Sequence, residues 1–269
     1  MRKPNQLFLF SFGCWVLILL VAPLFFTPEA LLKTNLAQEF CRPWVCGLFG
    51  LGENGIDLLV HTFCAAQWAI VLSTAVCFTS VLIGVPLGIF SSLALSGVDQ
   101  SITLTTNLFL SFPSMLIAIA LSAFLGQGFF TVWFILSITG WAPFCRLSRA
   151  ATLQVKSQEF VQSARSMGCS TWRICLKHIL PNIFPVILVQ AAFQLSGIII
   201  VESTLSFLGL GLPQDIPSLG KLIYIGKNHI LDAPHAAVIP GGFIVILITG
   251  FYLSGMILDQ KITHREMVS

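Results

Sequence analysis

The residues able to carry covalent chemistry are few in this chain, and their spacing is unlike that of an enzyme. None of the five His lies in the middle of an apolar stretch, and neither H-E-x-x-H nor G-x-S-x-G occurs. The eight Cys include no C-x-x-C pair, so no zinc or iron–sulfur site is predicted. A G-x-x-x-x-G-K-[ST] phosphate loop is also missing. The sequence therefore predicts no catalytic residue and no metal site, and an intramembrane hydrolase is the least favoured class.

One acid has unusual surroundings. Glu202 is the only acidic residue well inside an apolar stretch, and a charge at the centre of a membrane costs about 2.5–3.5 kcal/mol. We expect such a group to face a bundle interior or a wet path. Glu202 and Ser203 are therefore candidates for lining or gating a translocation path. The alternative is a structural hydrogen bond, for which Ser203 and Thr204 would compete locally, and the sequence leaves both open.

The chain that must position these residues has the composition of an integral membrane protein. Of its 269 residues 56% are hydrophobic and 9% are charged, and the mean hydropathy is +0.90. Soluble domains carry about 25% charged residues. The net charge of +3 is small and scattered, which argues against a nucleic-acid partner. The apolar stretches far exceed the roughly ten-residue segments of a membrane barrel, so an all-α polytopic membrane protein is predicted.

Six apolar stretches approach or exceed the roughly 20 residues that a membrane-spanning helix needs. They cover about residues 7–26, 62–95, 102–125, 129–146, 183–207 and 237–258. We interpret the first as a retained anchor, because its apolar run is longer than that of a signal peptide and no A-x-A cleavage site follows. Within the second stretch, Pro86 between Gly84 and Gly88 predicts a small-residue contact with a neighbouring helix.

The distribution of Lys and Arg places both termini in the cytoplasm. Ten of the fourteen basic residues then lie on cytoplasmic segments: Arg2, Lys3, Arg146, Arg149, Lys156, Arg165, Arg173, Lys177, Lys261 and Arg265. Residues 27–61 and 208–236 form long outward loops that collect six of the eleven acids. Cys41 and Cys46 lie in the first of these loops, where an oxidising compartment could join them, and the sequence leaves this pairing open.

The cytoplasmic segment 147–182 is the most informative part of the chain. Ser157 is predicted to cap a short amphipathic helix with Glu159 in its first turn, and Gly168 to end that helix in the left-handed conformation. Ser170 is predicted to cap a second helix that is interrupted at Pro181. A helix of about ten residues is marginal alone. Docking into a groove of a partner protein is therefore favoured over lying on the membrane surface.

This segment resembles the EAA loop of binding-protein-dependent ABC importer permeases. The similar residues are 159–168, with the sequence EFVQSARSMG, and 178–182, with the sequence HILPN. Gln162 stands where the family has Glu, and Ser163 where it has Ala.

Three further segments bear on this resemblance, which covers about residues 50–260 and points to the C-type subunit of the dipeptide, oligopeptide and nickel subfamily. Residues 111–114, SFPS, are similar to its FPS element, and residues 202–211, ESTLSFLGLG, to its E-x-x-LSFLGLG element. The chain departs from the subfamily near residue 52, where GENGID lacks the Arg of the GTD-x-x-GRD element.

The resemblance implies an ABC type I importer permease fold over residues 62–260, with the EAA loop at 147–182. Residues 1–61 would form an anchor helix and outward loop, and residues 261–269 a cytoplasmic tail. The implied function is a permease subunit that moves peptides or a similar small solute, nickel chelates among them, across the bacterial inner membrane. The implied partners are a homologous B-type permease in a heterodimer, two ATPase subunits that bind ATP and Mg, an extracytoplasmic solute-binding protein and membrane lipid. The chain itself would bind no cofactor.

The site residues fall into two groups. The predicted ATPase-coupling residues are Glu159, Gln162, Ser163, Ala164, Arg165, Gly168, Ile179, Leu180 and Pro181. The predicted residues of the translocation path or its gate are Phe112, Pro113, Ser114, Glu202 and Ser203. The alternative class is a self-sufficient secondary transporter or channel, which would work without an ATPase and would usually carry more ionisable groups inside the membrane.

Overall fold

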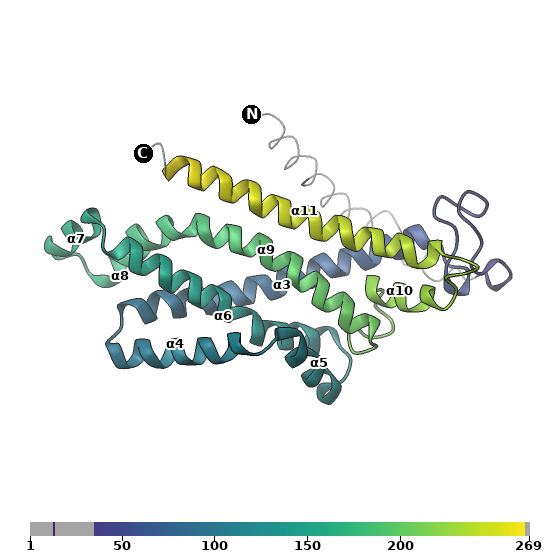
Figure 1. Ribbon diagram of the computed structural model, residues 1–269, viewed down its shortest axis with the longest axis horizontal. Helices are drawn as coiled ribbons and strands as arrows, with labels where there is room; N and C mark the ends of the chain where they lie inside the picture. Colours follow the sequence, from purple (N-terminus) through teal and green to yellow (C-terminus); the bar gives the residue numbers. More distant parts are fainter. Residues whose placement is uncertain (1–12, 14–34, 267–269) are drawn as a thin grey trace.

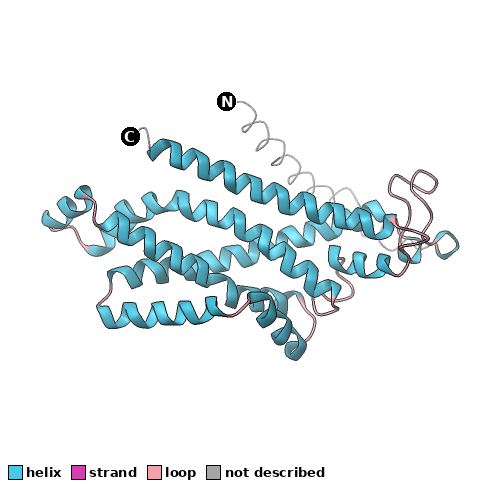
Figure 2. Cartoon of the chain, viewed as in Figure 1, coloured by secondary structure: helices cyan, strands magenta, loops and turns pink. Residues whose placement is uncertain are grey.

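The computed structural model describes residue 13 and residues 35–266, and this part of the chain is built from helices and connecting loops (Figures 1 and 2). Within it the only β pairing is an isolated bridge between Leu51 and Asp57. The predicted all-α class is confirmed. The first predicted span, residues 7–26, lies outside the described residues except for Gly13.

Four described segments are long and apolar enough to cross a membrane: α3 (Leu58–Leu93), α6 (Phe129–Lys156), Thr171–Phe207 and the greater part of α11 (His235–Glu266). A fifth span is formed if the bent pair α4 (Ser96–Ser111) and α5 (Ser114–Leu125) is counted as one. These five correspond to the second to sixth predicted spans. Figure 1 shows α3, α4, α6, α9 (Leu180–Phe207) and α11 running roughly along the long axis of the molecule, with α5 turned away from it.

The packing of α3 against α6 depends on the predicted small-residue contact. A Cβ atom on Gly84 would collide with the backbone oxygen of Trp141, and one on Gly88 would collide with Oγ of Ser148. Ser148 is fully buried and donates to the carbonyl of Phe144 at 2.7 Å. Because the glycines carry no side chain, the two helix backbones come together at this contact.

The third predicted span differs from a single straight helix. The helix α4 already begins at Ser96, although residues 96–101 lie between two predicted spans, and α5 is inclined to it by 81°. The break falls at Phe112 and Pro113, where Phe112 has an extended backbone with φ −95° and ψ 137°. A residue before proline avoids the helical region, and proline has no N–H to continue the helix, so the FPS segment bends the chain.

The prediction that Pro181 interrupts a helix is wrong. The short α8 (Thr171–Ile174) continues through a π-helical turn (Cys175–Ile179) into α9 (Leu180–Phe207). The Leu180 N–H donates to the carbonyl of Cys175, five residues back. Pro181 lies in the first turn of α9, where the absent N–H is tolerated, and the π turn adjusts the backbone just before it.

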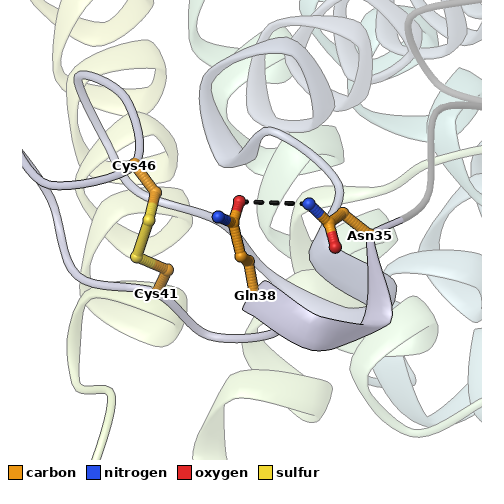
Figure 3. The surroundings of a disulfide bond; sticks show 4 residues. All are labelled: Asn35, Gln38, Cys41 and Cys46. Carbon is orange, nitrogen blue, oxygen red and sulfur yellow. Dashed lines mark hydrogen bonds between the residues drawn. A yellow bond between two sulfur atoms is a disulfide. The ribbon is translucent and has the colours of Figure 1, made fainter.

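One end of the molecule carries α10 (Leu219–Lys227), which lies within residues 208–236, and a loop closed by the disulfide Cys41–Cys46. The Cα atoms of this pair are 5.9 Å apart, so the pairing that the sequence left open is present. Figure 3 shows the disulfide beside a 3₁₀ turn (Leu36–Gln38), where the Asn35 side-chain amide donates to that of Gln38 at 3.1 Å.

The segment that departs from the subfamily, Gly52–Asp57, forms a turn and caps the start of α3. It forms a second 3₁₀ turn (Glu53–Gly55), whose Asn54 N–H donates to the carboxylate of Glu39 at 3.0 Å. The Asp57 carboxylate then caps α3 by accepting from the Leu59 N–H at 2.8 Å. The start of α3 is therefore capped without the missing Arg.

Candidate coupling helix and translocation groove

The predicted coupling residues begin on α7 (Glu159–Ser166), a two-turn helix at the opposite end of the molecule from the disulfide loop (Figure 1). Val161 and Ala164 of this helix are buried in the main apolar core, with exposures of 1% and 4%. Phe160 and Met167, which helical spacing places near the same face, are 41% and 78% exposed. The helix is therefore attached to the bundle by a narrow contact and presents apolar side chains to the outside.

The two ends of α7 agree only partly with prediction. Ser157 does not cap this helix, because α6 continues ten residues beyond its predicted end and Ser157 terminates it, donating to the carbonyl of Gln154 at 2.8 Å. The residue before α7 is Gln158, which makes no side-chain cap. Gly168 has the predicted left-handed backbone, with φ +79°, and the predicted cap at Ser170 accepts from the Arg173 N–H at 3.4 Å.

Gln162 has a role that the sequence did not reveal. Its side-chain amide donates to the carbonyl of Lys156 at 2.9 Å and so fastens α7 to the end of α6. The last carbonyls of a helix have no partner within that helix, which is the signal that could have located this bond. An ionised Glu, the family residue, has no proton to donate.

The remaining coupling residues differ in how far they are exposed. Glu159, Ser163 and Arg165 are exposed on α7. Ile179 is fully buried in the π-helical turn, and Leu180 and Pro181 begin α9.

Sequence reasoning missed Trp172, which is 72% exposed on α8. We use the name coupling surface for the exposed side chains of Phe160, Arg165, Met167 and Trp172.

Glu202 is buried in α9 with an exposure of 1%. Its carboxylate accepts from the Ser206 hydroxyl at 2.8 Å and from the Ser203 hydroxyl at 3.3 Å. Ser206 in turn accepts from the Leu212 N–H at 3.3 Å, which links α9 to the loop that follows it. Thr204 is turned to its own helix and donates to the Ile200 carbonyl. This geometry favours the structural alternative, with Ser206 as the partner that the sequence analysis missed although it lies one turn from Glu202.

A groove of about 430 Å³ opens at the break between α4 and α5. The break contributes Phe112 and Ser114, α6 contributes Thr139, and α9 contributes Gln194. Gln194 donates to the Gly140 carbonyl at 3.0 Å and so joins α9 to α6 along the groove.

The structure thus separates the predicted path residues. The FPS break lies at the groove, whereas Glu202 and Ser203 are not among its lining residues. Thr139 and Gln194, which were not predicted, could have been noticed as polar residues inside apolar stretches.

The family described as "Binding-protein-dependent transport system inner membrane component" matches residues 84–264. The oligopeptide transport system permease protein OppC of Bacillus subtilis is 32% identical over 94% of this chain and 84% of its own length. OppC of Haemophilus influenzae is 31% identical over 93% and 81%. The probable D,D-dipeptide transport system permease protein DdpC of Escherichia coli is 30% identical over 86% and 79%.

Two structures of the inward-facing MetNI methionine ABC transporter share the fold. Their TM-scores are 0.60 and 0.64 at 18% and 19% identity, and the match covers 73% and 78% of this chain and 94% and 99% of theirs. The predicted type I importer permease fold is therefore confirmed. The chain belongs to the family of binding-protein-dependent transport system inner membrane components, as an all-α, multi-pass permease.

Proposed function

We propose that this chain is the C-type permease subunit of an ATP-driven importer that moves peptides or a similar small solute into the cell. The substrate class is supported by the names of the relatives, which refer to oligopeptide and D,D-dipeptide transport. The observation that carries the coupling mechanism is the coupling surface. It presents apolar side chains and Arg165 beyond the end of the bundle, on a chain whose sequence has no phosphate loop.

The coupling surface docks into a cleft of a separate ATPase, which binds ATP and Mg. Arg165 has an alternative role, in which its charge is exposed to solvent or contacts a lipid headgroup. Because Val161 and Ala164 are embedded in the core and Gln162 holds the end of α6, a displacement of α7 is passed directly to the spans. Closure of two ATPase subunits on ATP binding would supply that displacement.

The groove at the FPS break is one wall of the translocation path, and a homologous B-type permease supplies the other wall. The groove is mainly apolar, and Ser114, Thr139 and Gln194 provide a few polar groups. Such a lining offers hydrogen bonds to a peptide backbone without a fixed charge that would hold it. A solute-binding protein delivers the solute at the end with the disulfide loop, and both termini lie in the cytoplasm.

The test is purification of the tagged chain in mild detergent, with identification of the co-purifying proteins and reconstitution into vesicles for uptake measurements. We expect an ATPase, a second permease and uptake of labelled peptides that requires ATP. Replacing Met167 by Ser in the coupling surface should reduce recovery of the ATPase, while Leu231→Ser, a 93% exposed residue at the other end, should not. Recovery of the chain alone, with uptake independent of ATP, would refute the proposal in favour of a secondary transporter or channel.

A further inference from the structure

We propose that Asp99 and Arg149 are positioning residues that make α4 move together with α6 during transport. The inference rests on the proposed function, because it concerns how movement of the coupling helix α7 reaches the groove. The Asp99–Arg149 ion pair belongs neither to the coupling surface nor to the groove.

The pair is held by a convergent set of hydrogen bonds at the α7 end of the bundle. Arg149 on α6 donates from Nε and from Nη2 to the two carboxylate oxygens of Asp99 on α4, both at 2.6 Å. Ser91, near the end of α3, donates to the same carboxylate at 2.6 Å. The side chains of the pair are only 28% and 26% exposed, and it is the only ion pair within the described part of the chain. A two-pronged contact of this kind fixes orientation as well as distance.

Apart from this ion pair, α4 packs against α6 and α3 with few buried side chains. Only one of its sixteen residues, Thr106, is buried, and Figure 1 shows the helix at the edge of the bundle beside α6. Thr106 contacts the sulfur of Cys145 at 3.5 Å, and Phe109 meets Trp141 edge-on at 5.2 Å between ring centres. Both contacts are also with α6. An exposed helix with few apolar contacts can slide along its neighbour. The Asp99–Arg149 ion pair, which we call the clamp, therefore sets the axial position of α4 on α6.

Hydrogen bonds at the end of α6 connect the region of the clamp to the coupling helix α7. Two helical turns beyond Arg149, Lys156 donates to the Ser92 carbonyl of α3 at 2.6 Å. The carbonyl of Lys156 accepts a hydrogen bond from the side-chain amide of Gln162 on α7. The ends of α3 and α6, the start of α4 and the helix α7 are therefore joined within a short distance.

This arrangement provides a mechanical route from the coupling helix to the path. A displacement of α7 moves the end of α6, the Asp99–Arg149 clamp carries α4 with it, and α4 moves the break at Phe112 and Pro113. That break contributes Phe112 to the groove. Without the clamp, α6 would shift while α4 lagged behind, and ATP would be hydrolysed without a matching change in the groove.

The experiment measures ATP hydrolysed per peptide imported by the complete complex in proteoliposomes, with labelled peptides of two to five residues as the probe. Coupling between sites typically amounts to about 5–150-fold. For Asp99→Asn we expect about a tenfold rise in ATP used per peptide. The charge exchange Asp99→Arg with Arg149→Asp should recover most of the loss. Asp215→Asn, an exposed acid in the outer loop, is the matched control and should not change the ratio.

A second variant separates coupling from folding. Thr106→Cys places a thiol beside the native sulfur of Cys145, so that oxidation can join α4 to α6. In the Asp99→Asn background this cross-link should restore the ratio of ATP to peptide. An Asp99→Asn complex that is merely less abundant, with an unchanged ratio, would overturn the inference and leave the proposed function standing. A wild-type complex without ATP-dependent uptake would instead overturn the proposed function.

Discussion

Replacement of Glu202 distinguishes the two roles that the sequence left open for this residue. Its carboxylate accepts two hydroxyl hydrogen bonds, from Ser203 and Ser206, and is almost completely buried. In Glu202→Gln the side chain keeps its shape and one acceptor oxygen, and a serine hydroxyl can turn to accept from the new amide. In Glu202→Leu neither serine has an acceptor at this position.

The expected magnitudes follow from this count of partners. A buried hydroxyl left without a partner costs about 1–3 kcal/mol, so Glu202→Leu should destabilise the chain by about 2–6 kcal/mol. For a domain of this size, 1 kcal/mol corresponds to about 2–4 °C in Tm. We therefore expect Glu202→Leu to melt at least about 4 °C lower in detergent. Glu202→Gln should stay close to wild type.

The assay compares melting temperature with uptake per assembled complex. If Glu202 has the structural role favoured by the geometry, Glu202→Gln retains uptake, and Glu202→Leu loses stability and abundance together. A Glu202→Gln complex of normal stability and abundance that no longer transports would refute this reasoning. It would show that the charge itself is needed, as the path-lining alternative requires.

Three further predictions concern other parts of the chain. Gly168→Ala forces a side chain into a left-handed backbone, at a cost of about 1–2 kcal/mol; uptake per complex should fall with normal expression, and unchanged uptake would contradict this. Gly88→Val should disrupt the α3–α6 contact at Ser148 and lower the yield of folded protein in size-exclusion chromatography, whereas a normal yield would argue against the packing. Cys41→Ser removes the disulfide and should speed proteolysis of the loop that it closes while leaving ATPase recovery unchanged; equal cleavage rates would refute the first part.

Patterns that depend on nearby residues predicted this protein well. The length of the apolar stretches predicted the described spans, since a buried helix must satisfy its own backbone. Gly168 could be assigned to a left-handed turn and Ser170 to a cap, because both roles depend on a few adjacent residues. The EAA-like segment likewise pointed to the family, which the comparisons confirm.

Predictions about helix ends were wrong where the local sequence pattern is compatible with two structures. Ser157 has the right side chain to begin a helix, but α6 extends far enough for Ser157 to end one instead. Pro113 and Pro181 both lie in or beside apolar stretches. Pro113 lies at a break between two helices, whereas Pro181 is accommodated by a π-helical turn. The choice depends on how the neighbouring helices pack, which is not encoded in the adjacent residues alone.

Contacts between residues far apart in the sequence were decided only by the tertiary structure. Asp99 and Arg149 are fifty positions apart, and no spacing rule joins them, but the packing of α4 along α6 brings their charges together. The same packing brings the FPS break to Thr139 and Gln194 to form the groove. The sequence by itself predicted a helical membrane protein, because hydrophobic length and capping are local properties. Its resemblance to the EAA loop predicted a permease with a cytoplasmic coupling segment. Which polar groups meet inside the bundle was set by the register between helices, a property of the assembled fold.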